Sequence, residues 1–87
     1  MPYIKPEDRA PLDALIDQLC AVLPAEDFAG QVNYVVSNLC AGVLREKKNY
    51  ARINELVGAL ECAKLELYRR VAAPYEDMKI EQNGDVY

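Results

Sequence analysis

Apolar residues recur every three or four positions in three stretches of the chain, which is the spacing of an amphipathic α-helix. The stretches cover about residues 11–23, 28–45 and 50–72. The second contains several β-branched valines, but the period of its apolar positions stays closer to that of a helix than to that of a strand. The pattern therefore predicts an all-α fold, a three-helix domain made of a helical hairpin and a long third helix.

Prolines and capping residues predict where these helices begin and end. Pro11 suits the first position of the first helix, where its missing N–H costs nothing, and Pro24 ends that helix. Asp27 and Asn49 have the short polar side chains that cap a helix N-terminus, so they are expected to start the second and third helices. Pro74 is expected to end the third helix.

The two ends of the chain are predicted to lie outside the three helices. Residues 1–10 contain two prolines and are expected to form an extended arm. Residues 74–87 are expected to form a short C-terminal tail. Within this tail, residues 76–82 favour a short helix and the pair Asn83-Gly84 favours a turn.

The size of the chain bears on its state of assembly. With 87 residues, we expect a single helical domain over 1–87. The apolar content of 52% suits a packed protein and argues against a disordered chain. A domain this short buries only about 60–65% of its unfolded surface. Since small helical proteins often complete their core by pairing with copies of themselves, we expect a homo-oligomer.

Charge is distributed unevenly along the chain. The net charge is −4, yet residues 45–52 sum to +3 and residues 74–87 sum to −3. This total disfavours long-range attraction to a nucleic-acid polymer, which we do not expect as a partner. The basic stretch is too short to identify a binding site by itself, and its simplest interpretation is a solvated loop.

The cysteine and hydropathy patterns indicate a cytoplasmic protein. The chain has three cysteines, an odd number without the spacing of a metal site, and we expect them to be small buried hydrophobes in a reducing compartment. The N-terminus lacks the pattern of a signal peptide. No apolar run reaches the roughly 20 residues that span a bilayer, so no membrane is expected as a partner.

The absence of histidine removes the commonest general base and metal ligand. We therefore predict no catalytic residues, no metal site and no cofactor, and we do not expect an enzyme. Asp13 and Asp17 are spaced four apart on a predicted helix, but carboxylates in that position usually lie on a solvated face.

Tyrosine and arginine supply the candidate binding residues. Arg69 and Arg70 follow Tyr68 at the end of the third predicted helix, where cations also stabilise the helix dipole. Guanidinium groups beside tyrosine rings can bind a phosphate and stack on a base. Packing at the rim of the fold is the simpler interpretation of these tyrosines. The candidate ligand-binding residues are Tyr50, Arg52, Tyr68, Arg69, Arg70 and Tyr75.

Several motifs are similar to those of short bacterial, prophage and tailed-phage proteins of uncharacterised function. They are the opening MPYIKPEDR and the segments LYRR, APYED and NGDVY near the C-terminus. The resemblance covers most of the chain, least of all residues 45–49, and brings no established activity with it. It implies a small accessory protein, in the host-cell cytoplasm if the chain is phage-encoded.

Two functions are compatible with these patterns. The first is a ligand-binding oligomer that sequesters a small anionic, nucleotide-type host immune signal at a subunit interface. The second is a protein-interaction module that inhibits or adapts a host or phage protein through a helical face or the acidic tail. The first rests partly on an analogy of size and helical content with small phage proteins that counter host defence.

Overall fold

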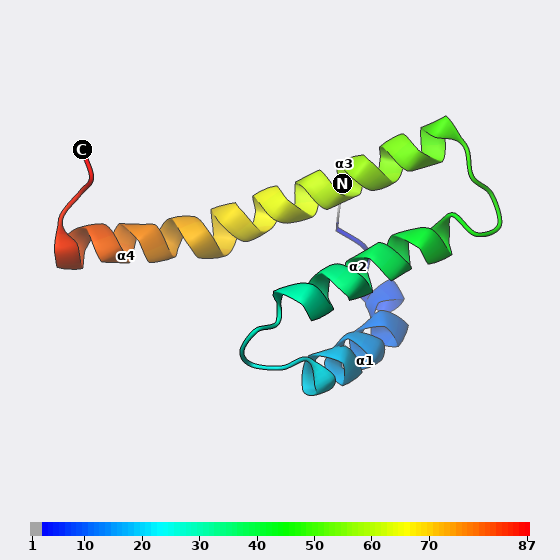
Figure 1. The fold of residues 1–87 in the computed structure, drawn as a ribbon, viewed down its shortest axis with the longest axis horizontal. Coiled ribbons are helices and arrows are strands. Elements are labelled where there is room, and N and C mark those ends of the chain that lie inside the picture. The colour runs from blue at the N-terminus through cyan, green and yellow to red at the C-terminus, as the bar shows by residue number, and fades with distance from the viewer. Residues whose placement is uncertain (1–2) are drawn as a thin grey trace. The chain divides into compact units, whose positions relative to one another are not determined.

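A computed structural model describes residues 3–87 and confirms the all-α fold (Figure 1). No strand occurs among these residues. Two shorter helices are followed by a long third helix, which consists of three consecutive segments. The segments in chain order are α1 (Pro6–Val22), α2 (Ala29–Val43), α3 (Tyr50–Leu67), the π-helical turn η1 (Tyr68–Ala72) and α4 (Ala73–Asn83).

Helix α1 begins five residues earlier than the sequence pattern predicts. Pro6 occupies the first turn, where the backbone N–H groups have no acceptor within the helix, so a proline there loses no hydrogen bond. Glu7 and Asp8 lie in the same turn and stabilise the positive end of the helix dipole. The prediction of an extended arm is therefore wrong from Pro6 onward, and Pro11 lies inside the helix. Residues 1–2 of that arm lie outside the described residues.

The connection between α1 and α2 also differs from the prediction at its cap. Asp27 has a φ of 53°, in the left-handed region that aspartate tolerates better than most residues. Phe28, not Asp27, occupies the N-cap position, and no side chain caps this helix. By contrast, the prediction for the third helix is confirmed, because Asn49 Oδ1 accepts a hydrogen bond of 2.9 Å from the backbone N–H of Arg52.

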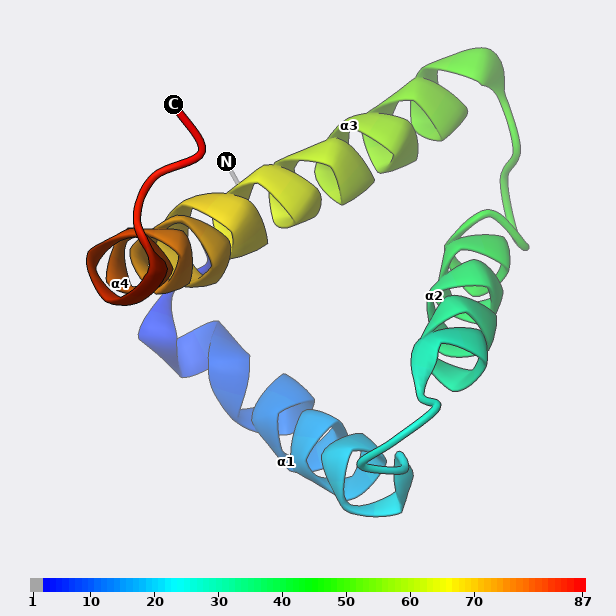
Figure 2. The ribbon, with the colours of Figure 1, turned by 60° about the vertical axis from the view of Figure 1, so that its left-hand side comes forward.

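The third helix continues through Pro74 instead of ending there. It runs for 34 residues, from Tyr50 to Asn83, and Figures 1 and 2 show it as one unbroken coil. The π turn lies directly before the proline, and within it the N–H of Ala73 donates to the carbonyl of Tyr68, five residues back. We attribute this wider turn to Pro74, which has no N–H and whose ring clashes with the carbonyl four residues earlier in a regular helix.

The C-terminal residues of the predicted tail are thus largely helical. Helix α4 ends at Asn83, and Gly84 has a φ of 86° while its N–H donates to the carbonyl of Ile80 at 2.8 Å. Glycine adopts this positive φ without a steric cost, so the helix ends at the Asn83-Gly84 pair, but residues 84–87 do not form the turn that was predicted there. Only residues 84–87 remain outside the helix.

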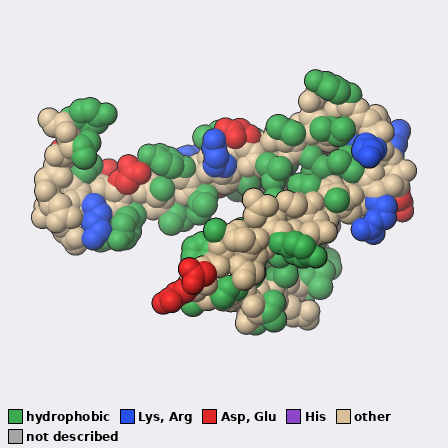
Figure 3. Space-filling view, in the orientation of Figure 1, with side chains coloured by type: hydrophobic (Ala, Val, Ile, Leu, Met, Phe, Trp, Pro, Cys, Tyr) green, Lys and Arg blue, Asp and Glu red, His purple; other side chains and the backbone are tan. Residues whose placement is uncertain are grey.

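The chain divides into two compact units, residues 3–52 and residues 53–87. No residue in the described part of either unit is buried. Large apolar side chains stay exposed along the long helix: 60% of Val57, 62% of Leu67 and 59% of Val71 are accessible to solvent. Hydrophobic side chains are visible along both α3 and α4 in Figure 3. The single domain expected over 1–87 stays a prediction.

The cysteines are less buried than the sequence suggests. All three thiols are free, Cys20 and Cys62 are exposed, and Cys40 is half-buried. The prediction that they are buried hydrophobes is therefore wrong for the isolated chain. The physical reason is the same as for the leucines and valines, since neither unit encloses a core.

Candidate functional site

The six candidate residues fall into two groups, one in each unit. Tyr68, Arg69 and Arg70 belong to the π turn, and Tyr75 lies in the first turn of α4. These four residues share one continuous helix. Tyr50 and Arg52 lie in the first turn of α3, which belongs to the other unit, 3–52.

A hydrogen bond across the π turn joins Tyr68 to Glu76. The hydroxyl of Tyr68 donates to Glu76 Oε1 at 3.0 Å, although the two residues are eight positions apart. In a regular α-helix such residues point in directions about 80° apart, and the extra residue of the π turn brings them to the same side. This hydrogen bond, with the negative charge of Glu76 and a smaller effect of desolvation, raises the pKa of Tyr68 above its ordinary value of 10.0.

The arginines of the π turn differ in their partners. Arg70 Nε lies 3.6 Å from Glu66 Oε1, one helical turn earlier, and this ion pair is largely exposed. Arg69 is exposed and its side chain makes no hydrogen bond or ion pair within residues 3–87. In α4, the ammonium of Lys79, one helical turn after Tyr75, lies 5.5 Å from the centre of the Tyr75 ring. The segment therefore carries cations and aromatic rings, with acidic residues interleaved among them.

Arg52 has a structural role in the connection between α2 and α3. Its Nε donates to the carbonyl of Lys47 at 2.7 Å, and its Nη2 donates to the carbonyl of Val43 at 2.6 Å. Val43 is the last residue of α2, and the carbonyl groups at the end of a helix receive no hydrogen bond from a following turn. Arg52 thus caps α2 and fastens the loop. Tyr50, two residues earlier, is 78% exposed.

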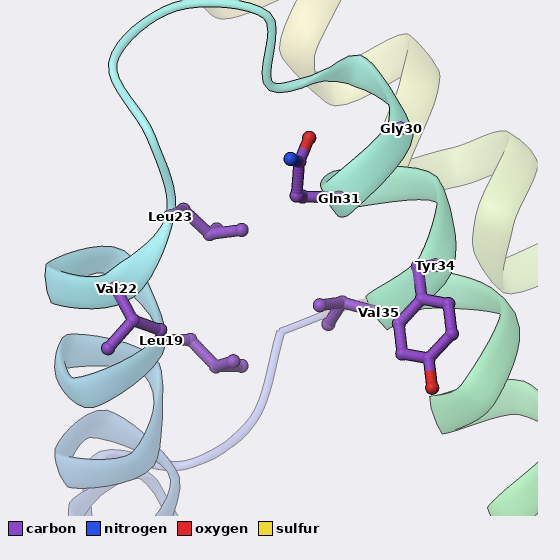
Figure 4. Close-up of a pocket in the computed structure, with 7 residues that line it drawn as sticks. All are labelled: Leu19, Val22, Leu23, Gly30, Gln31, Tyr34 and Val35. Carbon is purple, nitrogen blue, oxygen red and sulfur yellow. The ribbon is translucent and has the colours of Figure 1, made fainter.

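An apolar groove between α1 and α2 was not predicted from the sequence. Its volume is about 490 Å³. Figure 4 shows Leu19 and Leu23 pointing from the end of α1 toward Gln31 and Val35 of α2. Several residues that line the groove belong to the apolar stripes of the two predicted helices, but these stripes were expected to fill a core. The lining residues are Leu19, Val22, Leu23, Gly30, Gln31, Tyr34 and Val35.

A second groove of about 420 Å³ lies along α4 and the residues that follow it. Tyr75 and Lys79 line it together with Glu76 and Asp85. Because the groove brings carboxylates next to the lysine, its charge is mixed. The carboxylates make this groove a poor site for a free anion.

A family match covers residues 1–86, and the family is described as a domain of unknown function (DUF6899). The chain belongs to the DUF6899 family. This membership agrees with the resemblance to a family of uncharacterised function and assigns no activity to the chain. Comparison with curated proteins and with solved structures gave no match.

Two further features of the chain concern metals and membranes. Within residues 3–87, no three carboxylate or thiol side chains gather in a cluster that could hold a metal ion. Over the same residues, none of the helices combines the length and the apolar character needed to cross a membrane.

Proposed function

We propose that this chain is a non-enzymatic protein-interaction module whose helices bind another protein chain. The observation that carries the proposal is the absence of any buried residue in the part of the chain that the structure describes. Burying a leucine or valine side chain completely is worth about 1.5–3 kcal/mol, and this is the main favourable contribution to folding. In the isolated chain that contribution is largely unrealised.

The accessible surface area supports the same proposal. A compact monomer of 9.8 kDa has an accessible surface of about 5200 Å². The surface of this chain is 7924 Å². Monomeric proteins rarely leave large contiguous apolar patches exposed, and such patches mark sites of protein–protein contact. We infer that the helices become stable when a partner chain covers them.

The biological setting proposed for this interaction rests on the resemblance of the sequence motifs. Because the chain resembles short phage and bacterial proteins, an accessory role is proposed, in which the module adapts or inhibits a host or phage protein in the cytoplasm. The exposed apolar side chains of α3, among them Val57 and Leu67, are the proposed contact surface. No catalytic step is part of this role.

Thermal unfolding over a hundredfold range of protein concentration tests whether stability depends on a partner chain. If copies of the chain stabilise one another, Tm is expected to fall by about 4 °C for each tenfold dilution, because a dimer then loses about 1.4 kcal/mol. A cooperative transition with the same Tm at every concentration, in a protein that binds no hydrophobic dye, would contradict the proposal. Broad unfolding with dye binding at every concentration would support the proposed interaction module and indicate that its partner is a protein of different sequence.

Sequestration of a small anionic, nucleotide-type signal is the second candidate function. The observation that favours it is the position of the π turn, which holds Tyr68, Arg69 and Arg70. Single π turns inside α-helices occur frequently at functional sites. The exposed Arg69 guanidinium supplies a donor fork for a phosphate, with the Tyr75 ring one to two turns beyond it.

A thermal-shift panel of linear and cyclic nucleotides tests this second function. A nucleotide at about 100 times its Kd is expected to add about 2.7 kcal/mol to the free energy of unfolding, and denaturation should release it unmodified. The double substitution Arg69→Ala/Arg70→Ala is expected to remove the shift while the helix content stays the same. Lack of a shift with every nucleotide, or a shift that survives the double substitution, would exclude this site.

A further inference from the structure

We propose that the partner is a second copy of this chain, bound through the long helix with the two copies of that helix antiparallel. This inference rests on the proposed function, since it names the chain that covers the exposed helical surface. It goes beyond that function by assigning the element, the partner and the direction in which the partner runs.

The isolated chain leaves a large surface area accessible to solvent. The accessible surface exceeds that of a compact monomer by about 2700 Å² per chain. A standard stable interface buries only about 800 Å² on each partner, whereas obligate homodimers bury about 2000–5000 Å² in total. The excess on two copies is about 5400 Å², which lies at the upper limit of obligate homodimers and far above a standard interface.

The lengths of the helices also favour a second copy as the partner. The helix from Tyr50 to Asn83 has 34 residues and is about 51 Å long. Helices α1 and α2 have 17 and 15 residues, about half that length. Two helices pack along their whole length only when their lengths match. Within the described part of the chain, the element that matches the long helix is that helix itself, and a second copy supplies it.

The two ends of the long helix carry opposite charge. Residues 45–52, which lead into α3, sum to +3, and residues 74–87, which contain α4, sum to −3. Parallel copies would place like charges next to each other at both ends. Antiparallel copies place the basic end of one helix beside the acidic end of the other, at both ends of the pair. Complementary charge therefore favours the antiparallel direction.

The helix dipole strengthens this preference. Acidic residues stabilise the N-terminal turn of a helix, and basic residues stabilise the C-terminal turn. The first turn of α3 contains Arg52 and no acid, while the last turn of α4 contains Glu81 and no base. Each end of the isolated helix thus has the charge that its dipole disfavours. An antiparallel partner brings the favourable charge to each end.

Charge reversal at one end, followed by reversal at both, tests the direction of the pair. The substitutions Lys47→Glu and Lys48→Glu reverse the basic end and leave the hydrogen bonds of Arg52 intact, since those use backbone carbonyls. In an antiparallel dimer this change puts acids beside acids at both ends. The Kd of the dimer, measured by sedimentation equilibrium at low ionic strength with reductant present, is expected to rise by about tenfold or more.

Adding Asp77→Lys and Glu81→Lys to this variant is expected to restore the Kd to within about threefold of that of the unmodified chain, because opposite charges then face each other again. The matched control adds Asp13→Lys and Asp17→Lys instead. It has the same net charge, but both lysines lie in α1, so the Kd is expected to stay high. Restoration by the α4 pair alone supports the antiparallel dimer.

Several results would overturn the inference, and they separate it from the proposed function. If reversal of one end lowers the Kd, the helices are parallel, and if it leaves the Kd unchanged, the two ends do not face each other. If the control restores the Kd as well as the α4 pair does, net charge decides the affinity and not the ends of the helix. If the unmodified chain is a monomer that unfolds cooperatively, the proposed function fails too, whereas a monomer without cooperative unfolding removes only the second copy as partner.

Discussion

Leu60→Asp is expected to convert the assembled protein into monomers that unfold without a cooperative transition. Leu60 shares one side of α3 with Ile53, Val57 and Leu67, since the spacings of four, three and seven residues follow the helical period. All four side chains are exposed in the isolated chain, Leu60 by 44%. If this side is the interface, the substitution removes apolar contact and buries a charge, at a cost of about 3–5 kcal/mol.

Sedimentation equilibrium and the circular dichroism of thermal unfolding measure this effect. A loss of about 4 kcal/mol raises the Kd by nearly a thousandfold. Leu65→Asp is the matched control, because Leu65 is also exposed, by 55%, but points about 140° away around the helix. The control is expected to stay assembled. Equal effects of the two substitutions, or none from Leu60→Asp, would mean that this side of α3 is not the interface.

The helices follow from the sequence because their causes are local. Spacing of apolar residues is fixed by the helical period, and the cap at Asn49 depends on a backbone N–H three residues later. Pro74 shows where local rules stop being sufficient. A proline removes one hydrogen bond, but a helix can widen by one residue in place of ending, and the rule for helix ends does not include that alternative.

Burial could not be predicted from the same pattern. An apolar stripe indicates a surface that must be covered, but it does not indicate whether the same chain or another one covers it. The sequence therefore predicts that Cys62 is buried, whereas it is exposed in the isolated chain. Arg52 is a different case: its bond to the Val43 carbonyl, nine residues earlier, depends on the path of the loop. From residue type alone, Arg52 is expected to bind an anion.

Pro74→Ala is expected to stabilise the long helix and to convert the π turn into regular α-helix. Alanine restores the N–H that can donate to the carbonyl of Arg70, and removal of the ring ends the steric clash. Proline in a helix interior is about 3 kcal/mol less favourable than alanine, and the π turn has already relieved part of this cost. An increase of about 1–3 kcal/mol in the free energy of unfolding is therefore expected in denaturant titrations.

The same substitution should change the titration of Tyr68. Without the extra residue of the π turn, Tyr68 and Glu76 point in directions about 80° apart and their hydrogen bond is lost, so the pKa of Tyr68 should fall toward 10.0. The phenolate absorbance of each protein, minus that of its Tyr68→Phe counterpart, isolates this group from the other five tyrosines.

Glu76→Gln is the matched control for the titration, because it removes the carboxylate and keeps Pro74. It should lower the pKa of Tyr68 without stabilising the helix. The sign of the pH dependence follows from the raised pKa: the hydrogen bond contributes stability below pH 10.0, and this contribution is lost as the pH rises through the pKa of the folded chain. If Pro74→Ala leaves that pKa raised, the π turn persists without the proline, and its cause must lie in the residues 68–72 themselves.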